Sequence, residues 1–204
     1  AGVGANSGPK AIWEVGKKDW DWVMGVNYQG VLHGFQTFIP HMVEHGEESH
    51  LMTTVSLAGL LPGSGTYGVS KHAVMALTEA ARNDLLARGA NVSVSALCPG
   101  FVDTNIDKSE RNRPGYLTHP EVSLDESVIS PVSQLLRRGK QPSEIADIVF
   151  EAIKKGIFYI LPHPAWDEML RDRFDQMLSR EPLPTPSADE MARIFMPRDD
   201  GESY

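Results

Sequence analysis

The sequence has almost no cysteine, no excess of positive charge and no long apolar run. A single cysteine in 204 residues, Cys98, excludes an intrachain disulfide framework and is typical of a reducing compartment, so we expect a cytoplasmic protein. A formal net charge of −8 argues against a nucleic-acid partner, because no basic excess is available to neutralise phosphates. It gives no support for binding to an anionic membrane, and no apolar run approaches the length of a membrane span.

What the sequence does contain is an alternation of strand and helix patterns. Short hydrophobic runs predict strands at 51–57, 91–97 and 157–161. Apolar residues spaced by three and four predict helices at 18–44, 67–88, 142–155 and 166–179, with one further helical turn set at 131–138. This alternation indicates βαβ units and an α/β fold with a largely parallel sheet. We expect one domain over residues 1–180 and a Pro-rich acidic tail at 181–204, with a short helix at 188–195.

Two stretches have unusual features. The 18–44 helix has an apolar stripe that includes Val23, Phe35 and Phe38; Asn27 lies on the same face, and Pro40 is expected to kink the helix or begin its frayed end. Residues 103–141 are polar and punctuated by proline, which is long for a structureless connection and favours a lid or binding loop. The residues of this segment that we expect to line a substrate pocket are Ile106, Tyr116, Leu117, Val128, Ile129 and Leu135.

Tyr67 and Lys71 form the first candidate for chemistry. They are four residues apart, so both side chains share one face of the predicted helix. This spacing alone is weak, since a Tyr-x-x-x-Lys arises by chance in about one such chain in five. However, the pair opens a helix that follows a buried strand and the Gly-rich loop 59–65. It therefore lies at the carboxyl end of the sheet, where open α/β folds bind ligands.

Three further motifs share this context. They are Val26-Asn27 in the preceding helix, Thr53–Gly59 before the loop and Cys98–Thr104 after the next strand. In type and order they resemble the short-chain dehydrogenase/reductase family, over residues 1 to about 164. The resemblance implies a Rossmann-like, doubly wound parallel sheet, NAD or NADP as cofactor, and an oxidoreductase that interconverts an alcohol and a ketone or aldehyde.

The resemblance also implies roles for four catalytic residues. Tyr67 would be the general acid/base, and Lys71 would lower its pKa from near 10 by placing an ammonium nearby. Lys71 would also hydrogen-bond the nicotinamide ribose. Ser56 would donate to the substrate oxygen, and Asn27 would hold a water that links Lys71 to solvent. A plain structural role is the other interpretation of Asn27, as a core amide with satisfied hydrogen bonds.

Further residues would contact the cofactor by the same resemblance. Pro99, Gly100, Val102 and Thr104 match the family's segment beneath the nicotinamide, although a Pro-Gly pair ends strands in any fold. Ala1-Gly2 resembles the end of the motif that closes the family's fourth strand. Tyr67 and Lys71 are the remaining residues that the resemblance implies would contact the cofactor.

The sequence departs from the family in two ways. Ser56 precedes Tyr67 by eleven positions (67 − 56), two fewer than is usual, which we interpret as a shortened loop. Thr54 keeps the usual interval, but Ser56, immediately before Leu-Ala-Gly, is the better match to the family. In addition, no strand followed by a T-G-x-x-x-G-x-G turn is present, so we expect the first strands and the pyrophosphate site of the family's layout to be missing. A sheet without those strands would expose an apolar edge and apolar faces.

Other functions remain open. His41, Glu44 and His45 form an H-x-x-E-H pattern that in some hydrolases binds zinc, with His50 as a third nitrogen ligand, although Pro40 and Gly46 bracket it at a helix end. Alternatively, the chain is an inactive interaction module. In the family, the helices matching 18–44 and 67–88 pack across a dimer interface, so we expect a homodimer or homotetramer through them. We expect no metal.

Overall fold

Three strands form one parallel sheet in the computed structural model, which describes residues 2–4, 10–118 and 131–183. The strands are β1 (Ser49–Thr54), β2 (Val92–Leu97) and β3 (Tyr159–Ile160), in the order β1-β2-β3. Ser49 lies opposite Val92, and Ala96 lies opposite Tyr159. The predicted parallel sheet is confirmed. The predicted strand 157–161 is shorter than expected, because the Ile157 N–H bonds to the last turn of the preceding helix at Ala152 O.

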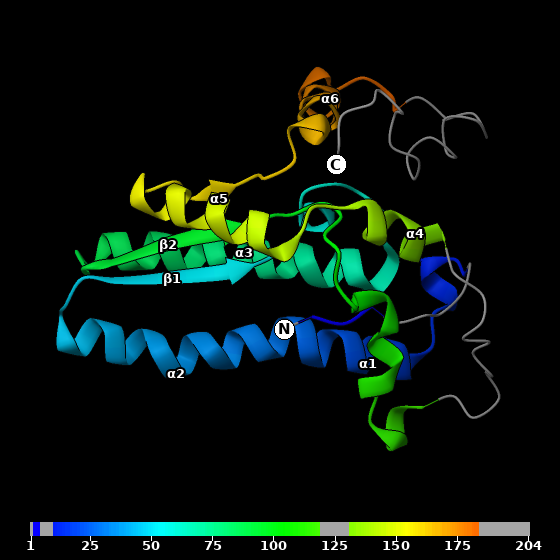
Figure 1. Ribbon diagram of the computed structural model, residues 1–204, viewed down its shortest axis with the longest axis horizontal. Helices are drawn as coiled ribbons and strands as arrows, with labels where there is room; N and C mark the ends of the chain where they lie inside the picture. Colours follow the sequence, from blue (N-terminus) through cyan, green and yellow to red (C-terminus); the bar gives the residue numbers. More distant parts are fainter. Residues whose placement is uncertain (1, 5–9, 119–130, 184–204) are drawn as a thin grey trace.

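Helices cover both faces of this sheet (Figure 1). On one face, α2 (Gly30–His45) and α3 (Gly65–Ala87) bury Val55 and Ala96 against Val74. On the other face, α5 (Pro142–Lys154) buries Leu97 and Ile160. Successive side chains of β2 therefore pack into two hydrophobic cores, one on each face of the sheet, as expected of a doubly wound α/β fold. No helix in the described ranges is long and apolar enough to span a membrane.

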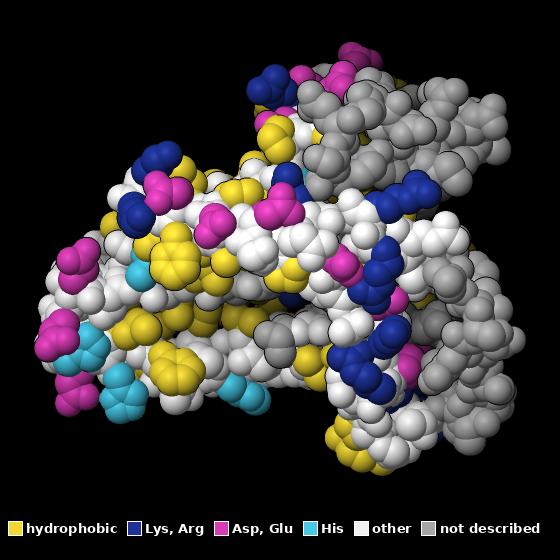
Figure 2. Space-filling view, viewed as in Figure 1, with side chains coloured by type: hydrophobic (Ala, Val, Ile, Leu, Met, Phe, Trp, Pro, Cys, Tyr) yellow, Lys and Arg dark blue, Asp and Glu magenta, His cyan; other side chains and the backbone are white. Residues whose placement is uncertain are grey.

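One edge of the sheet is β1 within the described residues. Met52 in this strand is 39% exposed, and Figure 2 shows hydrophobic side chains along the hollow between α2 and the sheet. This agrees with the expectation of an apolar edge.

The helix predicted at 18–44 is continuous but not uniform. It consists of α1 (Lys17–Met24), one π-helical segment (Gly25–Gln29) and α2, which continues through Pro40 to His45. Regular helix thus extends five residues past Pro40, so the chain does not fray from Pro40 onward. The apolar stripe is also incomplete, since Val23 is fully buried and Phe35 nearly so, whereas Phe38 is 58% exposed.

The segment after β2 is more ordered than the sequence suggested. It contains two 3-10 helices, Ile106–Asn112 and Gly115–Leu117, and then α4 (Pro131–Arg138). Arg113 anchors it to α1 through an ion pair with Asp19, and lies 4.6 Å from the centroid of the Trp22 ring. The helical turn set predicted at 131–138 is confirmed as α4, whereas the two 3-10 helices were not predicted. The predicted pocket residues Val128 and Ile129 lie outside the described residues.

The remaining elements are short or terminal. The 3-10 helices Ile12–Glu14, Leu57–Gly59 and Pro164–Trp166 precede α1, α3 and α6 (Asp167–Ser179), respectively. Leu57 thus belongs to a helical turn and not to the predicted strand. Arg173 of α6 donates to Leu60 O and approaches His72 Nε2 at 3.1 Å, which attaches α6 beside the start of α3. The predicted helix 188–195 lies outside the described residues.

Candidate active site

The carboxyl ends of the three strands bring the chemically important segments together. The strand register continues past each strand end: Val55 N donates to Leu97 O at 2.8 Å, Leu57 N to Pro99 O at 2.9 Å, and Cys98 N to Ile160 O at 2.9 Å. Residues that follow β1, β2 and β3 therefore meet at one edge of the sheet.

Ser56 lies at this edge, immediately before the 3-10 turn Leu57–Gly59. Its Oγ accepts from Ala58 N at 3.2 Å and lies 3.5 Å from Pro99 O. Its side chain also hydrogen-bonds to Tyr67. Thr54, which would keep the family's usual interval, is exposed and contributes only its carbonyl to Lys71. The geometry therefore favours Ser56 over Thr54 and a shortened loop.

Tyr67 and Lys71 occupy the first turns of α3, which begins at Gly65 rather than at Tyr67. Lys71 Nζ lies 5.6 Å from the centroid of the Tyr67 ring and donates to Thr54 O at 3.0 Å. The side chain of Lys71 is buried, and this desolvation lowers its pKa to about 8, while the Cys98 thiol nearby acts in the opposite direction.

The pKa of Tyr67 moves in the opposite direction to the one expected. Burial raises it, and the hydrogen bond with Ser56 only partly counteracts this effect. The expectation of a lowered pKa assumed that the Lys71 charge dominates. In the structure, Lys71 lies over the ring, and its own ammonium is disfavoured by burial.

Asn27 lies fully buried within the π-helical segment, a kind of distortion that is frequent at functional sites. Its Oδ1 accepts from Val3 N at 2.8 Å, and its Nδ2 donates to Val3 O at 2.9 Å and to Ser70 Oγ at 3.0 Å. The amide therefore fastens residues 2–4 to α3. It has the partners that a buried polar side chain needs.

Gly2 lies between Asn27 and Lys71. A Cβ at this position would be 3.4 Å from Lys71 Nζ and 3.7 Å from Asn27 Oδ1. The structure thus brings Gly2, Asn27 and Lys71 together. Ala1, the other residue of this predicted pair, lies outside the described residues.

The Pro99–Thr104 segment continues the same edge. A Cβ on Gly100 would be 3.2–3.3 Å from Trp166, His163 and Leu57, so the turn is closely packed. Val102 pairs with Lys140 in a parallel bridge and packs partly against the α5 core, while Thr104 is half-buried. The turn lies beside Ser56 as predicted, although the side chain of Val102 faces the α5 cluster.

Two residues near the site were not identified from the sequence. His163 follows β3 and bonds to Gly100 N at 3.1 Å and Phe101 O at 3.0 Å. The rule that ligands gather where parallel strands end would have pointed to it. Arg113 is almost completely buried between Asp19 and Glu110, a pairing across 94 residues that no local pattern indicates.

The predicted pocket residues differ in placement. Leu117 packs against the cluster of Val3, Trp22 and Val23. Ile106 and Leu135 are half-buried, whereas Tyr116 is 79% exposed. Only part of the predicted set therefore faces inward.

The alternative zinc site is not assembled. His41, Glu44 and His45 are exposed at the end of α2, and His50 Nε2 lies 3.1 Å from Ser95 Oγ. Over residues 2–4, 10–118 and 131–183, no three His, Cys, Asp or Glu residues are grouped so that they could hold a metal ion.

Comparison with known proteins identifies relatives of this arrangement. The profile of the family described as short chain dehydrogenase matches residues 1–115. The chain is 31% identical over 178 residues to a CLA biosynthesis dehydrogenase/reductase from Lactiplantibacillus plantarum, covering 84% of this chain. It is 33% identical over 163 residues to a C alpha-dehydrogenase from a Sphingobium species, covering 78%.

A solved structure also resembles this chain. A short chain dehydrogenase/reductase from Burkholderia phymatum, determined in complex with NAD, superposes with a TM-score of 0.78 at 42% identity, covering 92% of this chain and 68% of that one. The chain spans 62% and 52% of the length of the two curated relatives above.

Proposed function

The chain belongs to the short-chain dehydrogenase family, and from this premise we propose that it provides the proton-transfer half of an NAD(P)-dependent oxidoreductase acting on an alcohol or a ketone. The observation that carries the proposal is the grouping of Ser56, Tyr67 and Lys71 at the carboxyl edge of the sheet, with the Pro99-Gly100 turn beside them. Named relatives are dehydrogenases or reductases, and the Burkholderia phymatum structure was determined with NAD.

The residues present fit the nicotinamide end of such a cofactor. Lys71 donates one N–H to Thr54 O, and an ammonium has two more N–H groups that suit ribose hydroxyls. Gly2, which lacks a side chain, leaves room beside Lys71 Nζ. No Gly-rich phosphate-binding turn occurs in the sequence, so we assign no residue to the pyrophosphate.

The proton steps follow from this geometry. In ketone reduction, the Tyr67 hydroxyl donates its proton to the substrate oxygen; in alcohol oxidation, the phenolate accepts it. The cofactor, when bound, supplies or takes the hydride. The Ser56 hydroxyl lies beside Tyr67, and its contact to Pro99 O is long, so its proton can turn to a substrate oxygen that is bound next to Tyr67. Because burial raises the pKa of Tyr67, its neutral form is favoured, which suits reduction.

Asn27 has a more restricted role than the resemblance implied. Both N–H groups of its amide are committed, to Val3 O and to Ser70 Oγ. A water that links Asn27 to Lys71 therefore has to be held by an oxygen of Asn27. Fixing residues 2–4 beside Lys71 is a second contribution of the same side chain.

Titration of the purified chain with NADH and NADPH, followed by nicotinamide fluorescence, tests the proposal. We expect binding of at least one dinucleotide, and turnover of a secondary alcohol or ketone that Tyr67→Phe lowers by about 10²-fold or more. If neither dinucleotide binds, the oxidoreductase assignment fails for this chain, and the interaction module becomes the better interpretation.

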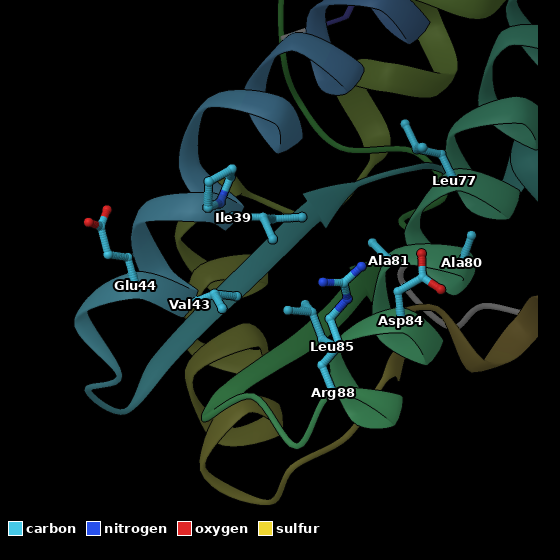
Figure 3. A pocket seen from close by; sticks show the side chains of 10 residues that line it. Ile39, Val43, Glu44, Leu77, Ala80, Ala81, Asp84, Leu85 and Arg88 are labelled. Atoms are coloured by element: carbon cyan, nitrogen blue, oxygen red, sulfur yellow. The ribbon is translucent and has the colours of Figure 1, made fainter.

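Self-association is the second candidate function, and a specific surface favours it. An open groove of about 570 Å³ runs between α2 and α3. Figure 3 shows Ile39 and Val43 of α2 facing this groove together with Leu77 and Ala81 of α3. We propose that a second copy packs here, because small and apolar side chains allow helices to approach closely. Sedimentation velocity over a range of concentrations would show a dimer or tetramer.

A further inference from the structure

His163 is a buried histidine that the proposed reaction does not use. It lies between Pro162 and Pro164, just after β3, and only 3% of its surface is exposed. Its ring reaches back to the turn after β2, which lies 63 residues earlier in the chain. A buried ring that bonds to the backbone of another strand end has a defined orientation.

The partners of the two ring nitrogens determine which one carries hydrogen. Nδ1 lies 3.1 Å from Gly100 N, a backbone donor, so Nδ1 has to be an unprotonated acceptor. Nε2 lies 3.0 Å from Phe101 O, which can only accept, so Nε2 has to carry the hydrogen. Both bonds exist together only in the neutral ring with hydrogen on Nε2.

These two bonds hold the Gly100–Phe101 backbone from the β3 side. On the β1 side, Leu57 N donates to Pro99 O at 2.9 Å. The Trp166 ring contacts Phe101, with 5.9 Å between centroids. His163 therefore supplies both a hydrogen-bond acceptor and a hydrogen-bond donor that fix the position of the turn between the two strand ends.

We propose that His163 is a positioning residue, whose neutral ring orients the Gly100–Phe101 backbone beneath the nicotinamide. This rests on the proposed function, because that function places the nicotinamide at this turn. His163 does not touch the reacting atoms. It acts through the peptide groups of the turn.

Acid should disrupt this arrangement. A proton on Nδ1 would face the N–H of Gly100, and the bond between them would be lost. Burial lowers the pKa of His163, assisted by the Lys140 ammonium; its hydrogen bond to Phe101 and the Glu144 carboxylate act in the opposite direction. The neutral form is thus favoured near neutral pH, and cofactor affinity should fall as the pH is lowered below the usual histidine pKa of about 6.5.

Three substitutions separate the two bonds. His163→Asn places an amide oxygen near the position of Nδ1 and keeps an acceptor for Gly100 N. His163→Gln can reach Phe101 O with its N–H. His163→Phe keeps a ring but neither bond. We expect dinucleotide Kd to rise about tenfold or more in His163→Phe, and His163→Asn to recover most of this loss, since one buried hydrogen bond changes an equilibrium by about fivefold.

The experiment combines NADH titration at pH 7.5 and 5.5 with NMR of the His163 ring and the Gly100 amide. In the wild type we expect the Nε2–H tautomer, a Gly100 amide signal that moves as His163 titrates, and weaker NADH binding at pH 5.5. In His163→Asn, the pH effect on binding should be much smaller.

Two results would overturn the proposal: a folded His163→Phe that binds NADH like the wild type, or a ring with hydrogen on Nδ1. If the wild type binds neither NADH nor NADPH, the proposed function fails, and NMR alone decides on His163. A Gly100 signal that does not respond to the titration of His163 would then contradict the positioning role, whereas a response that is lost in His163→Phe would support it.

Discussion

Along one side of α3, Ser70, Lys71 and Val74 are buried against the rest of the chain; along the adjacent side, Val69 is 44% exposed, and Ala80 lines the open groove toward α2. On the buried side each polar group has a partner within the chain: Ser70 Oγ donates to Tyr67 O at 2.7 Å, and Lys71 Nζ donates to Thr54 O at 3.0 Å. The groove side is mostly apolar, although Asp84 and Arg88 also line the groove. The buried side of α3 therefore has its packing and hydrogen-bond partners within the chain, whereas the groove side is available to bind a second molecule.

This difference explains why α3 carries small residues on both sides. On the buried side, the loop before α3 and the ends of the strands pack closely against the helix, and the candidate catalytic side chains lie between them. On the groove side, small residues leave a concave surface between two helices (Figure 3). Substitutions on the buried side should therefore change activity and folding, whereas substitutions on the groove side should change self-association.

The largest contrast is expected for Tyr67→Phe on the buried side. Removal of a general acid/base lowers turnover by about 10²- to 10⁴-fold, while the ring continues to fill its site. Val69→Ala, two residues away and on the groove side, is the control and should keep wild-type turnover. Steady-state rates with a secondary alcohol, together with thermal melts of both variants, measure this. A Tyr67→Phe variant with normal turnover would remove Tyr67 from the mechanism.

The second contrast is the pH dependence of stability that Lys71 contributes on the buried side. The pKa of Lys71 is lowered from 10.5 to about 8 in the folded chain, so the unfolded chain holds more protons between these values. The contribution of Lys71 to the unfolding free energy therefore rises from pH 8 toward 10.5, by up to about 3 kcal/mol. The pKa of Cys98 is raised from 9.0 to about 12, so this buried thiol acts against the gain above pH 9, and the raised pKa values of Tyr67 and Tyr159 do so above pH 10.

Urea unfolding at pH 7, 8, 9 and 10 measures this slope. Lys71→Met should remove the Lys71 contribution, so its unfolding free energy should gain less than that of the wild type between pH 8 and 10, and Val69→Ala should match the wild type. Identical pH profiles for the wild type and Lys71→Met would mean that Lys71 is not desolvated as the structure indicates.

The third contrast concerns the groove side. Ala80→Glu places a carboxylate among Leu77, Val43 and Ile39. Burial of this charge against a second copy should weaken self-association about 100-fold, with little change in the stability of the monomer. Ala146→Glu makes the same change at an exposed position of α5 and is the control. If sedimentation shows the same association for both variants, the groove is not the interface.

The sequence was sufficient for features that depend on local patterns. Spacings of three and four located the helices, short hydrophobic runs located the strands, and the motifs around Ser56, Tyr67 and Lys71 lie together as expected. Sequence patterns did not predict the contacts between residues that are far apart in the chain. The contact of Asn27 with Val3 spans 24 residues, and that of His163 with Gly100 spans 63. The direction of the Tyr67 pKa shift depends on burial, which no spacing reveals.

The smallest contrast uses two glycines. A Cβ on Gly68 of α3 would be 2.1 Å from the backbone oxygen of Gly63, which cannot move without shifting the loop before the helix. Gly68→Ala should therefore destabilise the fold by about 1–3 kcal/mol. At Gly34 of α2, nothing lies within 4 Å of the added atom, and alanine should stabilise by about 0.4–1 kcal/mol by reducing the freedom of the unfolded chain. Urea melts give both values. Equal effects would show that the loop from Ser56 to Tyr67 does not pack on α3 as closely as described.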